Sequence, residues 1–254
     1  MKILITGGSS GIGAALAQEY AKAGHALYLT GRNEIRLEMV AKECRERGAA
    51  EVVTAICDVT NREEMKNILS AWDQEGAFDI VIANAGISGG THGAPSKDLI
   101  VQSQKILDIN VMGVIHTLEP IYDSMLARKC GQIILISSLA SFSAWAGAPA
   151  YAASKAAVRV FGASLRPTLA RDGISVSVVC PGFVKSAMTD ANDFPMPFKM
   201  SAEKAAQIIV SGVSRRKALI TFPLVLTLVV RGLGLLPDTL LSGVTAMLPG
   251  KKSL

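Results

Sequence analysis

Tyr151 and Lys155 are about one helical turn apart in a stretch that predicts a helix, so their side chains share a face. An ammonium group beside a phenol favours the phenolate and lowers the pKa of the tyrosine from about 10. Such a tyrosine can protonate a carbonyl oxygen near neutral pH, or take a proton from an alcohol. Ser138 precedes this helix, and its hydroxyl can hold a substrate oxygen beside the phenol. Alone, the Tyr–Lys spacing also fits an ordinary half-exposed helix face.

Backbone groups that can hold a phosphate are predicted near the start of the chain, in the run Thr6-Gly7-Gly8-Ser9-Ser10-Gly11-Ile12-Gly13. The apolar residues 3–5 before it predict a buried strand, and residues 14–21 after it predict a helix, whose first N–H groups suit a pyrophosphate. We expect Gly7 to allow the tight turn, Gly11 to leave room for a phosphate, and Gly13 to bring the helix close to the strand. The spacing is neither Gly-x-Gly-x-x-Gly nor a P-loop, and a flexible turn is the alternative interpretation.

The adenosine ribose of a dinucleotide is expected about 20 residues past such a turn, at the end of the next strand. Residues 26–30 predict that strand, and Gly31 and Arg32 follow it. An acid there would bind the 2′-hydroxyl of NAD, whereas a guanidinium suits the 2′-phosphate of NADP. Arg32 therefore favours NADP over NAD, unless it is an ordinary solvated arginine.

These segments belong to a longer alternation of strands and helices, with strands predicted at residues 3–5, 26–30, 52–56, 79–83, 132–137 and 218–220. The nearly continuous apolar strands predict an α/β fold with a doubly wound parallel sheet. Ligands of such sheets lie beyond the carboxyl ends of the strands. Asp58, Asn84 and Gly86 fall at such ends, although these residue types also favour ordinary turns.

One polar residue interrupts the helix predicted over residues 97–128. Asn110, with Gly113 close by, lies in its middle, although asparagine and glycine are poor helix formers. Local rules are often broken at functional sites, so Asn110 is a candidate site residue.

Length and composition limit the classes of protein to consider. A chain of 254 residues suits one large domain. The first strand begins directly after Met1, so we expect a cytoplasmic protein. The four cysteines are far apart in the sequence, which predicts buried, reduced thiols and no metal site. The net charge of +5 comes from residues 201–254, and no nucleic-acid-binding motif accompanies it, so nucleic acid is not an expected partner.

Taken together, the motifs resemble the short-chain dehydrogenase/reductase family. The matching segments follow the family's order and spacing, and they are Thr6–Gly13, Cys57-Asp58-Val59, Ala83-Asn84-Ala85-Gly86, Asn110, Ile136-Ser137-Ser138, Tyr151-Ala-Ala-Ser-Lys155 and Pro181-Gly-Phe-Val-Lys-Ser186. The resemblance covers residues 1 to about 215. It implies a nicotinamide dinucleotide, no metal, and a homodimer or homotetramer.

The resemblance also implies a role for each matching residue. Tyr151 would be the general acid/base, Lys155 would lower its pKa and bind the nicotinamide ribose, and Ser138 would steady the substrate carbonyl. Asn110 would hold a water that links Lys155 to solvent. Further cofactor contacts are implied for Asp58, Val59, Asn84, Ala85, Gly86, Pro181, Gly182, Val184 and Ser186. Ser186 stands where the family usually has threonine, and Arg32 after Gly31 looks like the family's NADP-preferring pattern.

The C-terminal part is less typical of the family. Residues 183–200 look like the family's mobile substrate loop, within a dinucleotide-binding catalytic domain over residues 1–221. The extension over residues 222–254 is strongly apolar, but neither of its runs reaches the roughly 18–20 residues of a membrane span. Residues 222–248 either rest as an amphipathic element on a membrane or partner subunit, or pack over the substrate pocket.

The leading hypothesis is an NADP-dependent oxidoreductase that transfers hydride reversibly between the nicotinamide and a lipophilic carbonyl or secondary alcohol. An NAD-linked alcohol dehydrogenase of the same fold is the first alternative. A non-catalytic redox sensor that binds a dinucleotide is the second, although such a protein would be free to lose Tyr151 or Lys155. The expected location is cytoplasmic, with peripheral contact to the inner face of a membrane if the extension binds lipid.

Overall fold

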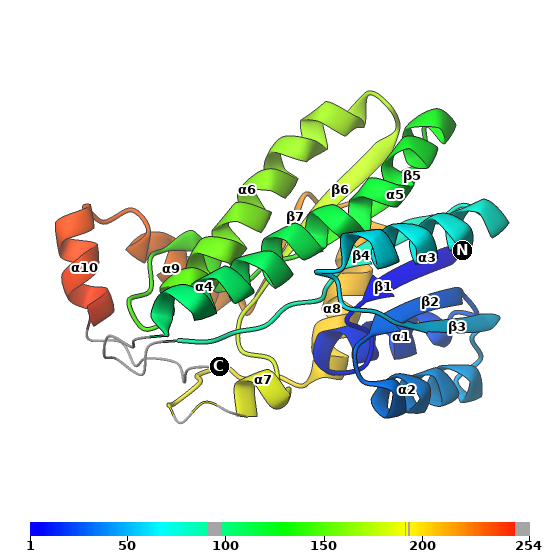
Figure 1. Ribbon diagram of the computed structural model, residues 1–254. Helices are drawn as coiled ribbons and strands as arrows, with labels where there is room; N and C mark the ends of the chain where they lie inside the picture. The colour runs from blue at the N-terminus through cyan, green and yellow to red at the C-terminus, as the bar shows by residue number, and fades with distance from the viewer. Residues whose placement is uncertain (91–97, 191, 193, 247–254) are drawn as a thin grey trace.

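The computed structural model describes residues 1–90, 98–190, 192 and 194–246. Its centre is a parallel sheet with the strand order β3-β2-β1-β4-β5-β6-β7, which confirms the predicted doubly wound architecture (Figure 1). The strands are β1 (Lys2–Thr6), β2 (Ala26–Gly31), β3 (Glu51–Ile56), β4 (Ile80–Ala83), β5 (Gly131–Ile136), β6 (Ile174–Pro181) and β7 (Leu219–Phe222).

Helices cover both faces of the sheet because successive strand residues point to opposite sides. In β1, Ile3 and Ile5 join the core under one helical layer, whereas Leu4 joins the core under the other. The first layer consists of α1 (Gly11–Ala21), α2 (Glu34–Glu46) and α8 (Ala202–Ser214). The second consists of α3 (Arg62–Glu75), α4 (Leu99–Leu107), α5 (Gly113–Arg128) and α6 (Pro149–Ala170).

The chain order places a switch point beside β1. It runs outward through β2 and β3, and then returns to lay β4 on the other side of β1. In a parallel sheet the turns after β1 and β4 therefore diverge, and they leave a crevice above the carboxyl ends of these two strands. The predicted glycine-rich turn and Asn84 both follow these ends.

Helix ends follow the sequence signals closely. Asn33 and Asn61 cap α2 and α3, since each side chain accepts a hydrogen bond from a backbone N–H in the first turn. The predicted helix over residues 97–128 is different: its first residue lies outside the described residues, and the rest is α4, a π-helical turn at Asp108–Met112 and α5. The wider turn accommodates Asn110, whose side chain bonds to a neighbouring segment.

The helix that carries Tyr151 is α6, which begins at Pro149 because proline suits the first helical turn. A short 3-10 helix at Leu139–Phe142 precedes it. The cysteines are all free, as expected, but Cys130 is exposed and the other three are buried.

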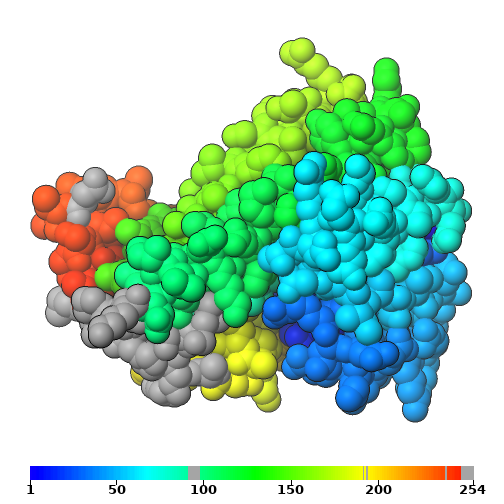
Figure 2. All heavy atoms as spheres, in the orientation of Figure 1, coloured from blue at the N-terminus to red at the C-terminus, as the bar shows by residue number. Residues whose placement is uncertain are grey.

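Over its described residues, 222–246, the C-terminal extension forms the helices α9 (Leu224–Leu233) and α10 (Asp238–Ala246). They lie beyond the carboxyl end of the sheet, near the ends of α4 and α6 (Figure 1). In the space-filling view their orange and red atoms project at the opposite end of the molecule from the blue atoms of α2 (Figure 2). Within the described residues, no helix combines the length and apolarity needed to cross a bilayer.

Candidate active site

A cavity of about 530 Å³ opens at the carboxyl ends of the strands. It collects nearly every predicted site residue, namely Gly7, Ser9, Ser10, Gly11, Ile12, Arg32, Asp58, Val59, Asn84, Ala85, Gly86, Ser138, Tyr151, Lys155, Pro181, Gly182, Val184 and Ser186. Gly13 and Asn110 do not line the cavity themselves, but each contacts residues that do.

The glycine-rich turn is held by backbone geometry. Gly7 and Gly11 have φ angles of +67° and +56°, which side chains other than hydrogen rarely tolerate. A Cβ on Gly13 would lie 2.3 Å from the Gly7 carbonyl oxygen, so only glycine lets α1 approach β1 this closely. Asn84 braces the turn from β4, because its amide nitrogen donates to the Thr6 carbonyl at 2.9 Å and to that of Gly7 at 3.2 Å. The turn therefore presents α1's first N–H groups to the cavity, as a diphosphate requires.

Positive charge gathers where β2 ends. Arg32 lies 3.5 Å from the Asp58 carboxylate and remains largely exposed. Burial raises the pKa of Asp58, but hydrogen bonds from Thr60 and the Arg32 charge outweigh this effect and leave the pKa below its usual value. Arg36 also lines this end of the cavity, and the sequence analysis missed it. The sequence did contain a signal for Arg36. A basic residue in the first turn of a helix is unfavourable beside the positive end of the helix dipole, unless an anion binds there.

Ser138 and Tyr151 meet at the centre of the cavity. Burial raises the pKa of Tyr151 above its ordinary value, and a hydrogen bond with the Ser138 side chain opposes that rise. The net shift is therefore upward, opposite to the fall in the Tyr151 pKa that the sequence predicted. The Lys155 Nζ lies 6.0 Å from the centre of the phenol ring, and burial of the phenol is the larger effect.

Lys155 is held in the wall of the cavity by contacts with the backbone. Its Nζ donates to the Ile136 carbonyl at 3.0 Å, and the Ser137 hydroxyl donates to the backbone carbonyl of Lys155 at 2.7 Å. Burial lowers the pKa of this ammonium group to about 8. A Cβ on Gly86 would lie 3.3 Å from Nζ and 3.1 Å from the Asn110 amide oxygen, so these three residues converge.

Asn110 joins three segments that are distant in the sequence. Its amide oxygen accepts from the Ile87 N–H at 2.8 Å, and its amide nitrogen donates to the Ile87 carbonyl at 3.0 Å. The same nitrogen donates to the Ser154 hydroxyl at 2.9 Å. Ser154 adjoins Lys155 in α6, so the π-helical turn places Asn110 where it links the segment after β4 to the helix that carries Tyr151.

The other end of the cavity is apolar. Trp145 and Phe194 meet edge to face with their ring centres 6.0 Å apart, and Phe183 packs against Phe194. Leu226, Val229, Val230 and Leu233 of α9 complete this wall. The sequence analysis did not name Trp145, and it placed the other residues only within the segments 183–200 and 222–254. Nothing in the spacing of the α9 residues indicates which face of that helix turns inward.

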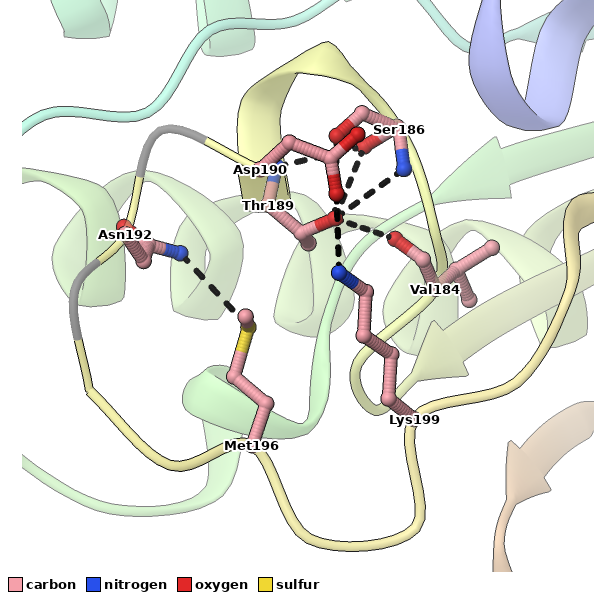
Figure 3. Close-up of polar contacts among 7 residues, drawn as sticks. All are labelled: Val184, Ser186, Thr189, Asp190, Asn192, Met196 and Lys199. Carbon is pink, nitrogen blue, oxygen red and sulfur yellow. Dashed lines mark hydrogen bonds and ion pairs between the residues drawn. The ribbon is translucent and has the colours of Figure 1, made fainter.

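The loop after β6 is closed by its own polar contacts (Figure 3). The Thr189 hydroxyl accepts from the Ser186 N–H at 3.0 Å and donates to the Val184 carbonyl at 2.9 Å. Lys199 pairs with Asp190 at 2.8 Å across the same loop. These bonds fold α7 (Ala187–Asp190) over the middle of the cavity, where Val184 and Ser186 line the wall.

The comparisons with known proteins agree with this geometry. The family model described as short chain dehydrogenase matches residues 1–194. The chain belongs to the short-chain dehydrogenase family. A short-chain dehydrogenase/reductase from Burkholderia phymatum, whose crystal structure contains NAD, has the same fold with a TM-score of 0.80. It is 25% identical to this chain, and the match covers 91% of this chain and 92% of that one.

Other short-chain dehydrogenase relatives extend the similarity over most of the chain. An uncharacterized oxidoreductase from Myxococcus xanthus is 38% identical over 239 residues, which are 93% of each protein. The 3-oxoacyl-[acyl-carrier-protein] reductase FabG of Rickettsia prowazekii is 35% identical over 74% of each chain. The 11-beta-hydroxysteroid dehydrogenase 1A of Arabidopsis thaliana is 34% identical over 87% of this chain and 68% of that protein. This chain is therefore an NAD(P)-dependent oxidoreductase of the family.

Proposed function

We propose that the protein transfers hydride reversibly between NADP and a lipophilic ketone or secondary alcohol, with Tyr151 as the general acid/base. The observation that carries the proposal is the position of Ser138 and Tyr151 between a cleft suited to a dinucleotide and an apolar chamber. A substrate carbonyl held by these two hydroxyls would have its apolar groups in the chamber and its carbon toward the cleft.

The protein's own contribution is position and a proton. A bound nicotinamide supplies the hydride. In reduction, Tyr151 donates its proton to the substrate oxygen, and Ser138 donates a hydrogen bond to the same oxygen. The raised pKa of Tyr151 keeps the phenol protonated at neutral pH, which suits an acid. Lys155 binds the ribose hydroxyls and supplies positive charge as the phenolate forms, and Asn110 holds a water that returns a proton from solvent.

The preference for NADP rests on two arginines. Arg32 and Arg36 line the end of the cavity where the adenosine ribose belongs, and β2 ends in a glycine rather than an acid. The comparison protein from Burkholderia phymatum holds NAD, so the NAD-linked dehydrogenase is the competing proposal. Titration of wild type and of the variant R32A/R36A with both cofactors separates them. We expect NADPH affinity to fall by about tenfold to a hundredfold, with NADH affinity unchanged. Tighter binding of NADH to wild type would contradict the preference.

The substrate class rests on the apolar chamber. Phe183, Phe194 and the inner residues of α9 offer few polar groups to a substrate, which suits a large apolar molecule. Two relatives are named for lipid-like substrates, one as a 3-oxoacyl-[acyl-carrier-protein] reductase and the other as an 11-beta-hydroxysteroid dehydrogenase. A screen of fatty, steroid and quinone carbonyls with NADPH tests the proposal. Tight NADPH binding without turnover of any carbonyl would favour the redox sensor instead.

We also propose a homodimer or homotetramer. Ile100 and Val101 of α4 and Val160 and Phe161 of α6 are exposed on neighbouring helices, and a second copy would bury them. Light scattering of wild type and of the variant I100Q/F161Q tests this contact. A monomeric wild type would overturn it.

A further inference from the structure

Helix α9 has apolar residues on two opposite faces. Its inner residues Leu226, Val230 and Leu233 line the cavity. Its outer residues are aliphatic and open to solvent: Leu224 is 68% exposed, Leu228 is 62% exposed and Val229 is 52% exposed. Exposed apolar residues in a contiguous stripe mark an interaction surface rather than ordinary protein surface. We call this outer stripe, together with the exposed Val225, the α9 outer face.

The α9 outer face belongs to a helix that is already docked. The Arg231 guanidinium lies 5.1 Å from the centre of the Phe142 ring, and a Cβ on Gly234 would lie 2.2 Å from the Phe142 carbonyl oxygen. At the start of the helix, Leu226 and Pro223 pack against Gly182 at the end of β6. The helix is therefore fixed by its inner side, and its outer leucines remain available for an external partner.

Charge and composition favour a lipid surface as that partner. In the sequence of residues 222–254, Arg231, Lys251 and Lys252 outnumber the one acid, Asp238. The α9 outer face consists of leucine and valine, without the aromatic side chains that usually centre a protein interface. A ten-residue helix with an exposed apolar side can lie in the plane of a bilayer surface, and Arg231, which is exposed about one turn past Leu228, can attract anionic headgroups.

The α9 outer face is also continuous with the substrate chamber. Val229 is both half exposed and a lining residue of the cavity, so the same helix separates the chamber from the outside. A molecule dissolved in a lipid layer against this face would reach the chamber past Val229 without crossing water.

We propose that the α9 outer face docks on a phospholipid bilayer and that a bilayer-dissolved substrate enters the cavity past α9. The docking step stands on the exposed residues alone, and the entry step rests on the function proposed above. This assignment unites the two alternatives for residues 222–248, since one side of α9 covers the pocket while the other side meets the membrane.

Vesicle flotation tests the docking step without any substrate. Wild type is floated with vesicles of phosphatidylcholine alone, and with vesicles of phosphatidylcholine and phosphatidylglycerol in equal parts. We expect binding to both, with tighter binding to the anionic vesicles. The variant L224Q/L228Q should bind about a hundredfold more weakly, because each leucine that enters an apolar phase contributes about tenfold or more. Glutamine keeps a good helix propensity, and neither leucine lines the cavity.

A matched control has the same spacing on another helix. Ile35 and Met39 of α2 are 74% and 58% exposed, and the variant I35Q/M39Q should float like wild type. Failure of wild type to bind either vesicle, or equal binding of L224Q/L228Q and wild type, overturns the docking step. A fall in the molecular mass of L224Q/L228Q in lipid-free buffer also overturns it, because the face would then be a contact between copies of the chain.

Kinetics with two ketones test the entry step. With a long-chain ketone dissolved in vesicles, L224Q/L228Q should show a KM raised at least about tenfold, in line with its lost membrane affinity. With a short, water-soluble ketone its kcat/KM should equal that of wild type. Equal KM values for the vesicle substrate overturn entry from the bilayer. If neither protein reduces any ketone, the proposed function fails while the flotation result still decides the docking step.

Discussion

The two ends of the cavity are built in different ways. The nucleotide end is shaped by backbone, since Gly13 lies against the Gly7 carbonyl and Asn84 bonds to two backbone oxygens of the turn. The substrate end is shaped by side chains such as Trp145, Phe194 and Leu226, which come from three separate segments. Backbone geometry leaves few alternatives, whereas an apolar wall tolerates any residue of suitable size. The first end can therefore hold one cofactor type while the second varies with the substrate.

The largest expected effect separates the two ends at Tyr151. The variant Y151F removes the proton donor and keeps the ring, so kcat should fall by about 10²–10⁴-fold while NADPH affinity stays the same. Steady-state kinetics with a responsive ketone and fluorescence titration of NADPH measure the two quantities. Unchanged kcat would remove Tyr151 from the chemistry, and an equal loss of NADPH affinity would show that the two ends are not separable.

Lys155 sharpens the comparison through stability. Its pKa in the folded protein is about 8, against 10.5 in the unfolded chain, so the folded state binds fewer protons between these values. The cost of burying the charge is full below pH 8 and is relieved as the pH rises toward 10.5. At pH 7 the free energy of unfolding of the variant K155M should therefore exceed that of wild type by about 3 kcal/mol, although the variant loses activity. Urea unfolding of both proteins at pH 7 and pH 9.5 measures the difference in their unfolding free energies, and this difference should be smaller at pH 9.5.

An equal difference between K155M and wild type at both pH values would indicate that burial of the ammonium group does not destabilise the folded protein. The conservative variant K155R is the control. Arginine keeps its charge at both pH values, so the contribution of residue 155 to the unfolding free energy should be the same at pH 7 and at pH 9.5.

Gly13 tests whether backbone geometry limits the nucleotide end. In G13A the new Cβ would meet the Gly7 carbonyl, so we expect a loss of about 1–3 kcal/mol in unfolding free energy and at least tenfold weaker NADPH binding. The control G232A adds a Cβ with no heavy atom within 4 Å, and it should be neutral or slightly stabilising. Equal behaviour of the two variants would contradict the backbone constraint.

The smallest expected effect tests the substrate end alone. In G234A the Cβ would push α9 away from the Phe142 carbonyl. We expect KM for a lipophilic ketone to rise by about threefold to tenfold, with NADPH affinity unchanged. The same G232A variant serves as the control within α9. A change in NADPH affinity instead would show that α9 shapes both ends of the cavity.

The sequence predicted most residues that line the nucleotide end of the cavity, some from local constraints and the others from the family resemblance. A glycine-rich turn after an apolar strand, a glycine and arginine after the second strand, and polar residues after the next strands each follow from short-range rules. The parallel sheet follows from the regular alternation of strands and helices, and the structure confirms it. Asn110 was also found locally, since it breaks helix propensity inside a predicted helix.

Tertiary structure decided what depends on contacts between distant segments. The direction of the Tyr151 pKa shift depends on burial, which outweighs the hydrogen bond with Ser138. Arg36 reaches the cavity only because the turn after β2 aims α2 at it. For α9, the sequence shows an apolar helix, but only the packing of Leu226 and Val230 against the buried cluster around Leu139 selects which side faces inward and which faces outward. Short-range rules determine the elements, and the packing of those elements determines their exposed and buried faces.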